Sequence, residues 1–247
     1  MIEFRNLTKS FGEKTVLDGI DLALRDREIT FIIGTSGTGK SVLVKHAVGL
    51  LRPDAGRVLV EGRDVTDLPE AQWLPIRLRH VLVFQHSTLF DSMTVADNVA
   101  LPLRKHRRLS RADARAEALR FLAHVGMEDR ADRMPSDIGP SERKRVAIAR
   151  ALTLEPEWTL LDEPTTGLDP IASRNVDAMI GRLGRDLGKS VVVVSHDLRS
   201  IFGVADRIVF LYKGRVRMDG PPQAFRSPAD PVVRQFVRGD PTGPMEG

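Results

Sequence analysis

The chain has 247 residues, of which 42% are hydrophobic and 28% are charged, with a formal net charge of +4. These values are typical of a globular protein, and we expect one domain over residues 1–247. The absence of cysteine excludes disulfides and thiolate metal sites, and so small a positive excess favours a solvated surface over a nucleic-acid partner.

No apolar run approaches the roughly 20 residues that cross a bilayer. The longest runs, Ile29–Ile33 and Val191–Val194, have the size of strands. Residues 1–11 alternate as a strand does and lack the basic and apolar regions of a secretory signal. We therefore expect a cytosolic chain that spans no membrane.

The N-terminal part is predicted to be rich in strands. One strand starts at Ile2, and apolar and polar residues alternate over Ile20–Leu24 as they do in a half-buried strand. The apolar run Ile29–Ile33 leads into a glycine-rich turn and a predicted helix over Ser41–Leu51, which is closed by Pro53. This order predicts a unit of strand, loop and helix.

The middle of the chain is predicted to be helical. The pattern runs from Phe84 to about Ser136, with amphipathic faces over Ser110–Val125 and Ser110 as N-cap. We expect a helical insert over about residues 85–155.

The core sheet is predicted to resume after this insert. Strands over Trp158–Leu161 and Val191–Ser195 flank a helix over Ile171–Leu187, which is the alternation of a buried parallel sheet. Ile208–Tyr212 and Arg215–Met218 predict a hairpin, and a tail follows over about residues 228–247. The predicted fold class is α/β, with a mostly parallel core sheet, an antiparallel β subdomain and the helical insert.

The segment Gly34–Ser41 fits the phosphate-binding pattern G-x-x-x-x-G-K-[ST] and stands between a predicted strand and a predicted helix. Glycines let the backbone amides turn toward phosphates, and a helix N-terminus favours negative charge. Lys40 would reach the β- and γ-phosphates, and Ser41 would ligate magnesium. The loop therefore predicts phosphate binding.

Polar side chains follow three predicted strands. Asp162 and Glu163 end the strand that begins at Trp158, His196 follows the strand ending at Ser195, and Gln85 follows Phe84. Ligands collect at the carboxyl ends of such strands. Asp162 would hold magnesium through water, and Glu163 would act on the attacking water as a base or orienting group. His196 could donate to the γ-phosphate, and Gln85 could contact magnesium or water.

In this order the motifs resemble an ABC transporter nucleotide-binding domain over nearly the whole chain. The resemblance implies a P-loop NTPase fold that binds ATP and Mg²⁺, with Phe11 stacking on adenine and Thr166–Asp169 as the D-loop, in which Asp169 is the acidic residue. The implied ATP-binding residues are Phe11, Gly34, Ser36, Gly37, Thr38, Gly39, Lys40, Ser41 and Val42. The implied magnesium ligands are Ser41, Gln85 and Asp162, and the implied catalytic residues are Gln85, Glu163 and His196.

In this family two cassettes pack head to tail, so that each ATP lies between one Walker A loop and the partner's signature motif. The resemblance implies a second ATPase subunit, in a homodimer, and integral membrane permease subunits. It places the chain at the cytoplasmic face of the inner membrane as a peripheral subunit.

The signature, usually L-S-G-G-Q, departs from the family pattern here and reads Ile138–Glu142. Gly139 lacks the hydroxyl and Pro140 lacks an amide proton, so two donors to the γ-phosphate are missing. Ser141 offers a displaced hydroxyl, whereas Glu142 adds negative charge nearby. We predict slow hydrolysis or a looser ATP-driven closure.

Three segments resemble the Mla and Mce lipid-trafficking subfamily. They are Lys40–His46, Phe84–Arg104 and Asp230–Pro244. The resemblance implies lipid transport with an Mce-type lipid-binding protein in the complex, and the stretch after Gln85 is the part that meets the membrane subunit there. Two alternatives are import of a small solute and a regulatory cassette with slow turnover. A translation factor or DNA-repair ATPase is disfavoured, because the chain has neither two cassettes nor a long coiled coil.

Overall fold

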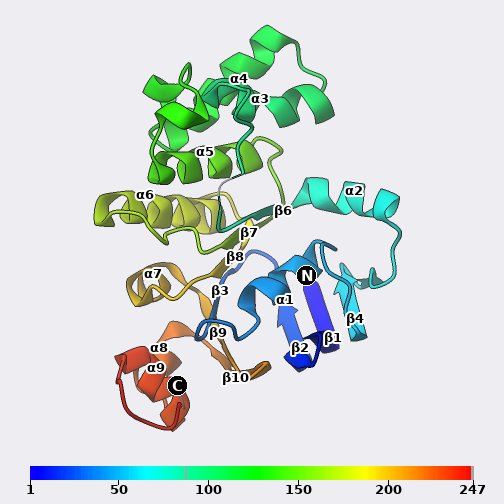
Figure 1. Ribbon diagram of the computed structural model, residues 1–247, viewed down its shortest axis with the longest axis vertical. Helices are drawn as coiled ribbons and strands as arrows, with labels where there is room; N and C mark the ends of the chain where they lie inside the picture. Colours follow the sequence, from blue (N-terminus) through cyan, green and yellow to red (C-terminus); the bar gives the residue numbers. More distant parts are fainter. Residues whose placement is uncertain (87, 246–247) are drawn as a thin grey trace.

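The protein is described from a computed structural model over residues 1–86 and 88–245. Position 87, in the segment after Gln85, and residues 246–247 of the predicted tail lie outside these described residues. Figure 1 shows the two termini, the two sheets and the helices around them. No described helix is both long and apolar enough to cross a bilayer.

The first sheet is antiparallel, with strand order β2-β1-β4-β5. Its strands are β1 (Ile2–Phe11), β2 (Lys14–Leu24), β4 (Ala55–Val60) and β5 (Arg63–Asp64).

The second sheet has the order β10-β9-β3-β8-β7-β6 and is parallel except for the hairpin of β9 and β10. Its strands are β3 (Ile29–Ile33), β6 (His80–Val83), β7 (Trp158–Asp162), β8 (Ser190–Val194), β9 (Arg207–Tyr212) and β10 (Arg215–Gly220). The predicted α/β class is confirmed.

Two hydrophobic cores lie on opposite faces of the second sheet. Val192 and Val194 of β8 belong to the core shared with the first sheet and α1 (Lys40–Ala47), whereas Val191 and Val193 belong to the opposite core. Every residue of β3, β7 and β8 is buried, and this burial on both faces explains why these strands are mainly apolar rather than alternating. The helices that cover the opposite face in Figure 1 are α6 (Pro170–Gly181), α7 (Leu198–Val204), α8 (Pro222–Arg226) and α9 (Pro231–Arg238).

A third core belongs to the helices at the top of Figure 1. They are α3 (Val95–His106), α4 (Arg111–His124) and α5 (Pro140–Leu152), with short 3₁₀ turns at Glu128–Arg130 and Pro135–Asp137. Ser110 caps α4 as predicted, since its side chain accepts a hydrogen bond from the amide of Asp113 at 3.1 Å.

The helical prediction from Phe84 onward is wrong for the first part of the segment, because the described residues between β6 and α3 form a loop. The buried side chain of Asn98 holds this loop by bonding both the amide and the carbonyl of Phe90, at 2.8 and 3.0 Å. Thr94 then caps α3.

The helix predicted over Ser41–Leu51 ends at Ala47 instead. The amide of Gly49 bonds the carbonyl of His46 and that of Leu50 bonds the carbonyl of Lys45, which is the Schellman pattern of a helix end. Gly49 has a φ of 64°, and a Cβ there would lie 2.1 Å from the ring of Trp73. The close approach of this ring fixes where the chain turns.

Trp73 belongs to α2 (Glu70–Arg79), which the sequence pattern did not predict. The helix carries Pro75 in its interior and buries only this indole, so it lacks an apolar stripe. The helix predicted over Ile171–Leu187 is also interrupted: α6 ends at Gly181, and a π-helical turn follows over Arg182–Asp186.

Candidate nucleotide-binding and hydrolysis site

The predicted phosphate loop connects β3 to the N-terminus of α1. Gly39 takes a φ of 96°, and a Cβ on it would lie 2.6 Å from Leu17, so only glycine fits this turn. Lys40 is buried, and its Nζ donates to the carbonyls of Gly34 and Thr35 at 2.9 and 2.8 Å. Burial lowers the pKa of Lys40. The N-cap residue of α1 is Gly39, which has no side chain to cap the helix, so the first amides of α1 are available as donors for an anion.

Ser41 and Asp162, both predicted to hold magnesium, lie in contact. The Ser41 hydroxyl donates to Oδ1 of Asp162 at 2.8 Å, and the carboxylate is 5% exposed. Burial raises the pKa of Asp162. A hydroxyl and a single carboxylate beside a phosphate loop fit Mg²⁺, which takes one or two protein oxygens together with phosphates and water.

Glu163 lies at the centre of a network of polar contacts. Its carboxylate accepts from the Thr166 hydroxyl at 2.8 Å and lies 3.0 Å from Nδ1 of His196. Its backbone has a φ of 53°, in the left-handed region. Lys144 of α5 holds this turn, because its Nζ donates to the carbonyls of both Glu163 and Thr166 at 2.8 Å.

Lys144 is a site residue that sequence reasoning missed as a contributor. Its side chain is 6% exposed, and burial lowers its pKa. The only signal in the sequence is its place in a helix whose buried residues are otherwise apolar.

Three further predicted site residues lie near strand or helix ends, namely Gln85, Phe11 and Asp169. Gln85 is exposed two residues after β6, whose Val83 pairs with Leu161 of β7. Phe11 ends β1 with its ring 48% exposed. Asp169 caps α6 by accepting from the amides at positions 171 and 172 at 2.9 Å. Among the residues that the structure describes, no hydrogen bond or ion pair joins these three to the carboxylates of the site.

The altered signature forms the start of α5, with Gly139 as N-cap and Pro140 as the first helical residue. The Glu142 carboxylate folds back to accept from the amide of Gly139 at 2.9 Å and from Nε of Arg130 at 3.3 Å. The bond from Gly139 is the main reason that the pKa of Glu142 is lowered. The negative charge predicted beside the nucleotide is therefore bonded to its own helix end and to Arg130. Ser141 is half-buried in the first turn.

The fold and this site define a P-loop ATPase. The family model described as ABC transporter matches residues 17–166, and the chain belongs to this family.

Curated relatives agree with this assignment. The chain is 34% identical over 244 residues to the probable ribonucleotide transport ATP-binding protein mkl of Mycobacterium tuberculosis, covering 99% of this chain and 68% of the relative. It is 38% identical over 220 residues to the methionine import ATP-binding protein MetN of Rhizobium johnstonii, covering 89% of this chain and 60% of the relative.

Solved structures agree as well. The cassette MJ0796, solved as a dimer with ADP and phosphate, has a TM-score of 0.84 at 31% identity and covers 90% of this chain and 99% of its own. CbiO1 from Clostridium perfringens, described as part of the ABC transporter complex cbiONQ, has a TM-score of 0.81 at 27% identity, with 97% and 95% covered.

The chain is thus an ATP-binding subunit of an ABC transporter that hydrolyses ATP with Mg²⁺ and couples this to transport. Mg²⁺, when bound, neutralises charge on the phosphates. The family and the dimeric cassettes support a paired subunit and membrane permease partners.

Proposed function

We propose that this subunit powers lipid transport by a membrane permease. The observation that carries the proposal is the resemblance of Phe84–Arg104 to the Mla and Mce lipid-trafficking subfamily, in which this stretch meets the membrane subunit. Phe84 and Phe90 are 37% and 51% exposed, as expected of apolar side chains that a partner protein covers in the complex. The tail Asp230–Pro244 supports the same subfamily. The complex would include an Mce-type lipid-binding protein, and the chain would lie peripherally at the cytoplasmic face of the inner membrane.

We assign the site residues as follows. Lys40 and the loop amides bind the β- and γ-phosphates, Phe11 stacks on adenine, and Ser41, Gln85 and Asp162 hold Mg²⁺. The carboxylate of Glu163 accepts a proton from, or orients, the attacking water, and His196 donates to the γ-phosphate. Lys144 keeps the Glu163 turn in position. The remaining loop contacts come from Ser36, Gly37, Thr38 and Val42.

We further propose that residues 139–142 of the signature contact the ATP bound to the partner subunit and offer it few hydrogen-bond donors. The amide of Gly139 already donates to Glu142, and Pro140 has no amide proton. This favours slow turnover, and it keeps a regulatory cassette as a second candidate. The methionine import relatives favour small-solute import as a third candidate.

Transport by the reconstituted complex tests the proposal. The chain would be co-expressed with its permease and placed in liposomes that contain a fluorescent phospholipid. We expect ATP-dependent transfer of the phospholipid that is lost in the Glu163→Gln variant. ATP-dependent uptake of radiolabelled methionine or ribonucleotide, with no lipid transfer, would instead establish the small-solute alternative.

A further inference from the structure

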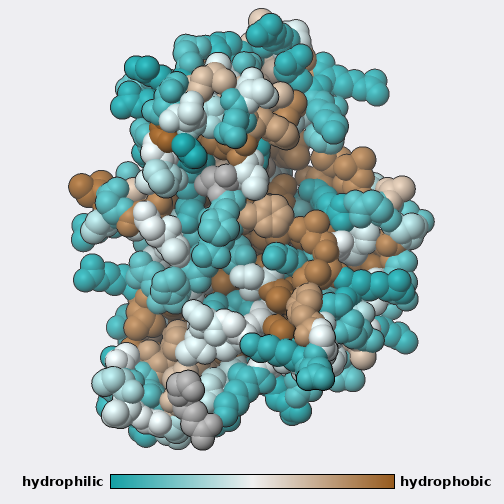
Figure 2. All heavy atoms as spheres, in the orientation of Figure 1, coloured by the Kyte–Doolittle hydropathy of each residue, from teal (hydrophilic) through white to brown (hydrophobic). Residues whose placement is uncertain are grey.

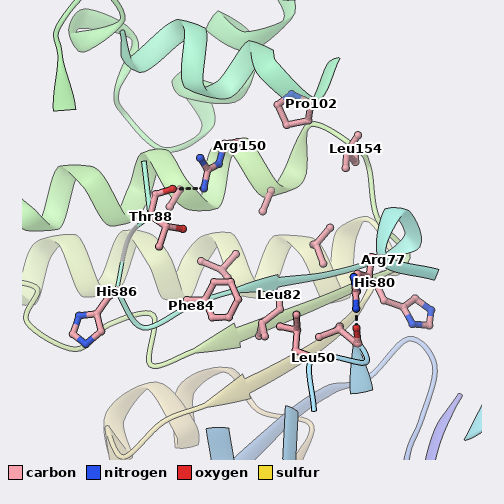
Figure 3. Close-up of a pocket in the computed structure, with 15 residues that line it drawn as sticks. Leu50, Arg77, His80, Leu82, Phe84, His86, Thr88, Pro102, Arg150 and Leu154 are labelled. Atoms are coloured by element: carbon pink, nitrogen blue, oxygen red, sulfur yellow. Dashed lines mark hydrogen bonds between the residues drawn. The ribbon is translucent and has the colours of Figure 1, made fainter. Parts of the chain in front are cut away.

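Loops at the carboxyl edge of the second sheet are held by polar side chains of nearby helices. Lys144 of α5 bonds the turn that carries Glu163. Arg150 of α5 donates to the carbonyl of Thr88 at 2.6 Å, in the loop that follows β6 (Figure 3). The loop that follows β8 carries His196, whose ring is exposed and has its Nδ1 3.0 Å from the Glu163 carboxylate. Because an exposed ring depends on its backbone for its position, the contacts of this loop decide where His196 lies.

Asp197 fixes the chain directly after His196. Its amide donates to the Ser195 hydroxyl at 3.0 Å, and one oxygen of its carboxylate accepts from the amide of Arg199 at 2.9 Å, which caps α7. The second carboxylate oxygen lies 3.4 Å from the hydroxyl of Ser200. The position of the Asp197 side chain therefore sets how the loop enters α7 and where the backbone of His196 lies.

Ser200 joins this loop to α6. It is 2% exposed, and its hydroxyl donates to Asp177 of α6 at 2.9 Å as well as to Asp197. The two helices lie side by side in Figure 1, and Figure 2 shows mainly hydrophilic surface over α7. A hydroxyl carries one hydrogen, so carboxylates from two helix regions share it. This buried hydrogen ties the loop of His196 to the helix that Asp169 caps.

Asp177 is a costly residue at this position. Its Oδ1 is buried and has no hydrogen-bond partner in the described part of the chain. Burial raises the pKa of Asp177 more than the bond from Ser200 lowers it, and the charge of Asp197 adds to the rise. An apolar side chain would pack without this penalty, as Val176 and Ile180 of α6 do in the core. A buried polar group that packing does not need calls for another role.

We propose that Asp177 and Ser200 are positioning residues for His196. Through Asp197 they hold the loop after β8, so that the ring of His196 stays beside Glu163. This positioning role rests on the proposed function, which assigns His196 to the γ-phosphate. Without the shared hydrogen the two aspartates would repel each other, and Asp197 would turn away from α6. The ring of His196 would then lose its fixed place at the Glu163 carboxylate.

A double-mutant cycle on ATP turnover tests this role in the complex of the chain with its co-expressed permease. Phosphate release from radiolabelled ATP at several concentrations gives kcat and KM down to low rates. We expect Ser200→Ala to lower kcat about tenfold and to leave KM within about twofold, because a displaced catalytic group costs rate rather than binding. In the His196→Ala background the same substitution should change kcat by less than about twofold, since the group that it positions is already absent. The same loss in both backgrounds would assign Ser200 a structural role only.

Variants of Asp177 separate the hydrogen bond from packing. Asp177→Asn keeps an oxygen that accepts from Ser200, so we expect turnover close to wild type. Asp177→Leu removes the acceptor and should lower kcat as Ser200→Ala does, and equal losses in both Asp177 variants would contradict the tether. Thr153→Val is a matched control, because the buried Thr153 hydroxyl bonds the carbonyl of Arg150 at the end of α5, at 2.7 Å. We expect its turnover to be unchanged, and thermal unfolding checks that each variant folds.

The His196→Ala variant alone distinguishes failure of the positioning role from failure of the proposed function. If its turnover equals that of the wild type, the role assigned to His196 is refuted, and the positioning role falls with it. If its turnover falls while that of Ser200→Ala does not, only the positioning role is overturned.

Discussion

Glu163 shows how single residues build this site. A non-glycine residue rarely adopts a φ near 53°, and such strain persists only where the surroundings impose it. Lys144 imposes it by bonding the carbonyls on both sides of the turn, while Thr166 and His196 hold the carboxylate. The strained turn thus aims one carboxylate from the end of β7.

Replacing this carboxylate tests its role. The Glu163→Gln variant keeps the shape of the side chain but removes its basicity, so we expect ATP turnover to fall by about 100-fold or more, the usual contribution of a general base. ATP affinity should stay within about twofold, because Lys40 and the loop amides are intact. Turnover in the reconstituted complex and binding of a fluorescent ATP analogue measure the two quantities. Undiminished turnover would refute the assigned role.

His80 makes stability depend on pH. Its ring is 1% exposed and lies 6.0 Å from that of Trp158, and burial lowers the pKa of His80 to about 4. The unfolded chain binds this proton near pH 6.5, whereas the folded chain does so only near pH 4. The free energy of unfolding should therefore fall as the pH drops from 6.5 to 4.

Urea unfolding of the wild type and of His80→Leu measures this effect. Between pH 7.5 and pH 5 the wild type should lose about 2 kcal/mol more than the variant, because a group with these two pKa values contributes about 1.4 kcal/mol for each pH unit below 6.5. His46 and the carboxylates titrate in both proteins and cancel in the comparison. Parallel pH profiles would show that His80 does not titrate in this way.

At the scale of elements, the start of α5 combines a good helix end with a poor phosphate site. Pro140 suits the first helical position, and Glu142 with Gly139 satisfies the end of the helix. In the shared site that we propose, these same features would remove donors from the γ-phosphate of the partner's ATP. The contacts that stabilise the start of the helix therefore leave fewer hydrogen-bond donors for a phosphate.

Restoring the family pattern should reverse this. We expect the triple variant Gly139→Ser, Pro140→Gly, Ser141→Gly to raise ATP turnover several-fold in the assembled complex. A Cβ at position 139 would lie 3.7 Å from Glu142, which is an ordinary contact, so the hydroxyl can be accommodated. Steady-state phosphate release measures the change, and an unchanged rate would contradict the predicted effect of the signature.

The junction of α1 and α2 depends on Gly49. An alanine there would combine strain at a φ of 64° with overlap of the Trp73 ring, so we expect Gly49→Ala to lower the free energy of unfolding by about 2 to 4 kcal/mol. Gly62 is a matched control, because its φ is 77° and no atom lies within 4 Å of its would-be Cβ. Gly62→Ala should cost about 1 kcal/mol from strain alone. If urea unfolding shows equal losses of unfolding free energy in the two variants, the Trp73 ring moves aside to accommodate the alanine.

At the scale of the whole molecule, one chain holds only half of the proposed site. The phosphate loop and Glu163 lie at the end of strands of the second sheet, while the signature begins α5. No described hydrogen bond joins residues 138–142 to the phosphate loop or to Glu163. The dimeric cassettes to which the chain is similar support completion by a second subunit.

Nucleotide-dependent dimerisation follows from this arrangement. We expect Glu163→Gln to form dimers with ATP and Mg²⁺, because ATP persists between the subunits, and to return to monomers with ADP. Light scattering after size-exclusion chromatography distinguishes the two masses. When the three signature substitutions are combined with Glu163→Gln, the dimer should persist to lower ATP concentrations. A monomer under every condition would contradict the shared site.

The sequence by itself determined the features that depend on neighbouring residues. A glycine-rich loop between strand and helix, carboxylates at the end of an apolar strand and a serine cap at position 110 are local patterns with local causes. Their order along the chain was sufficient to predict the α/β class, the ATP site and the resemblance to the family.

Only the tertiary structure decided what depends on residues far apart in the chain. The ring of Trp73 ends α1 at Ala47, Lys144 strains the turn of Glu163, and the ring of Trp158 lies against the buried ring of His80. None of these has a local signal, because each is a contact between segments that only the packed sheets and helices bring together. The altered signature is read from the sequence, but the bond between Glu142 and Gly139 that occupies its amide is seen only in the fold.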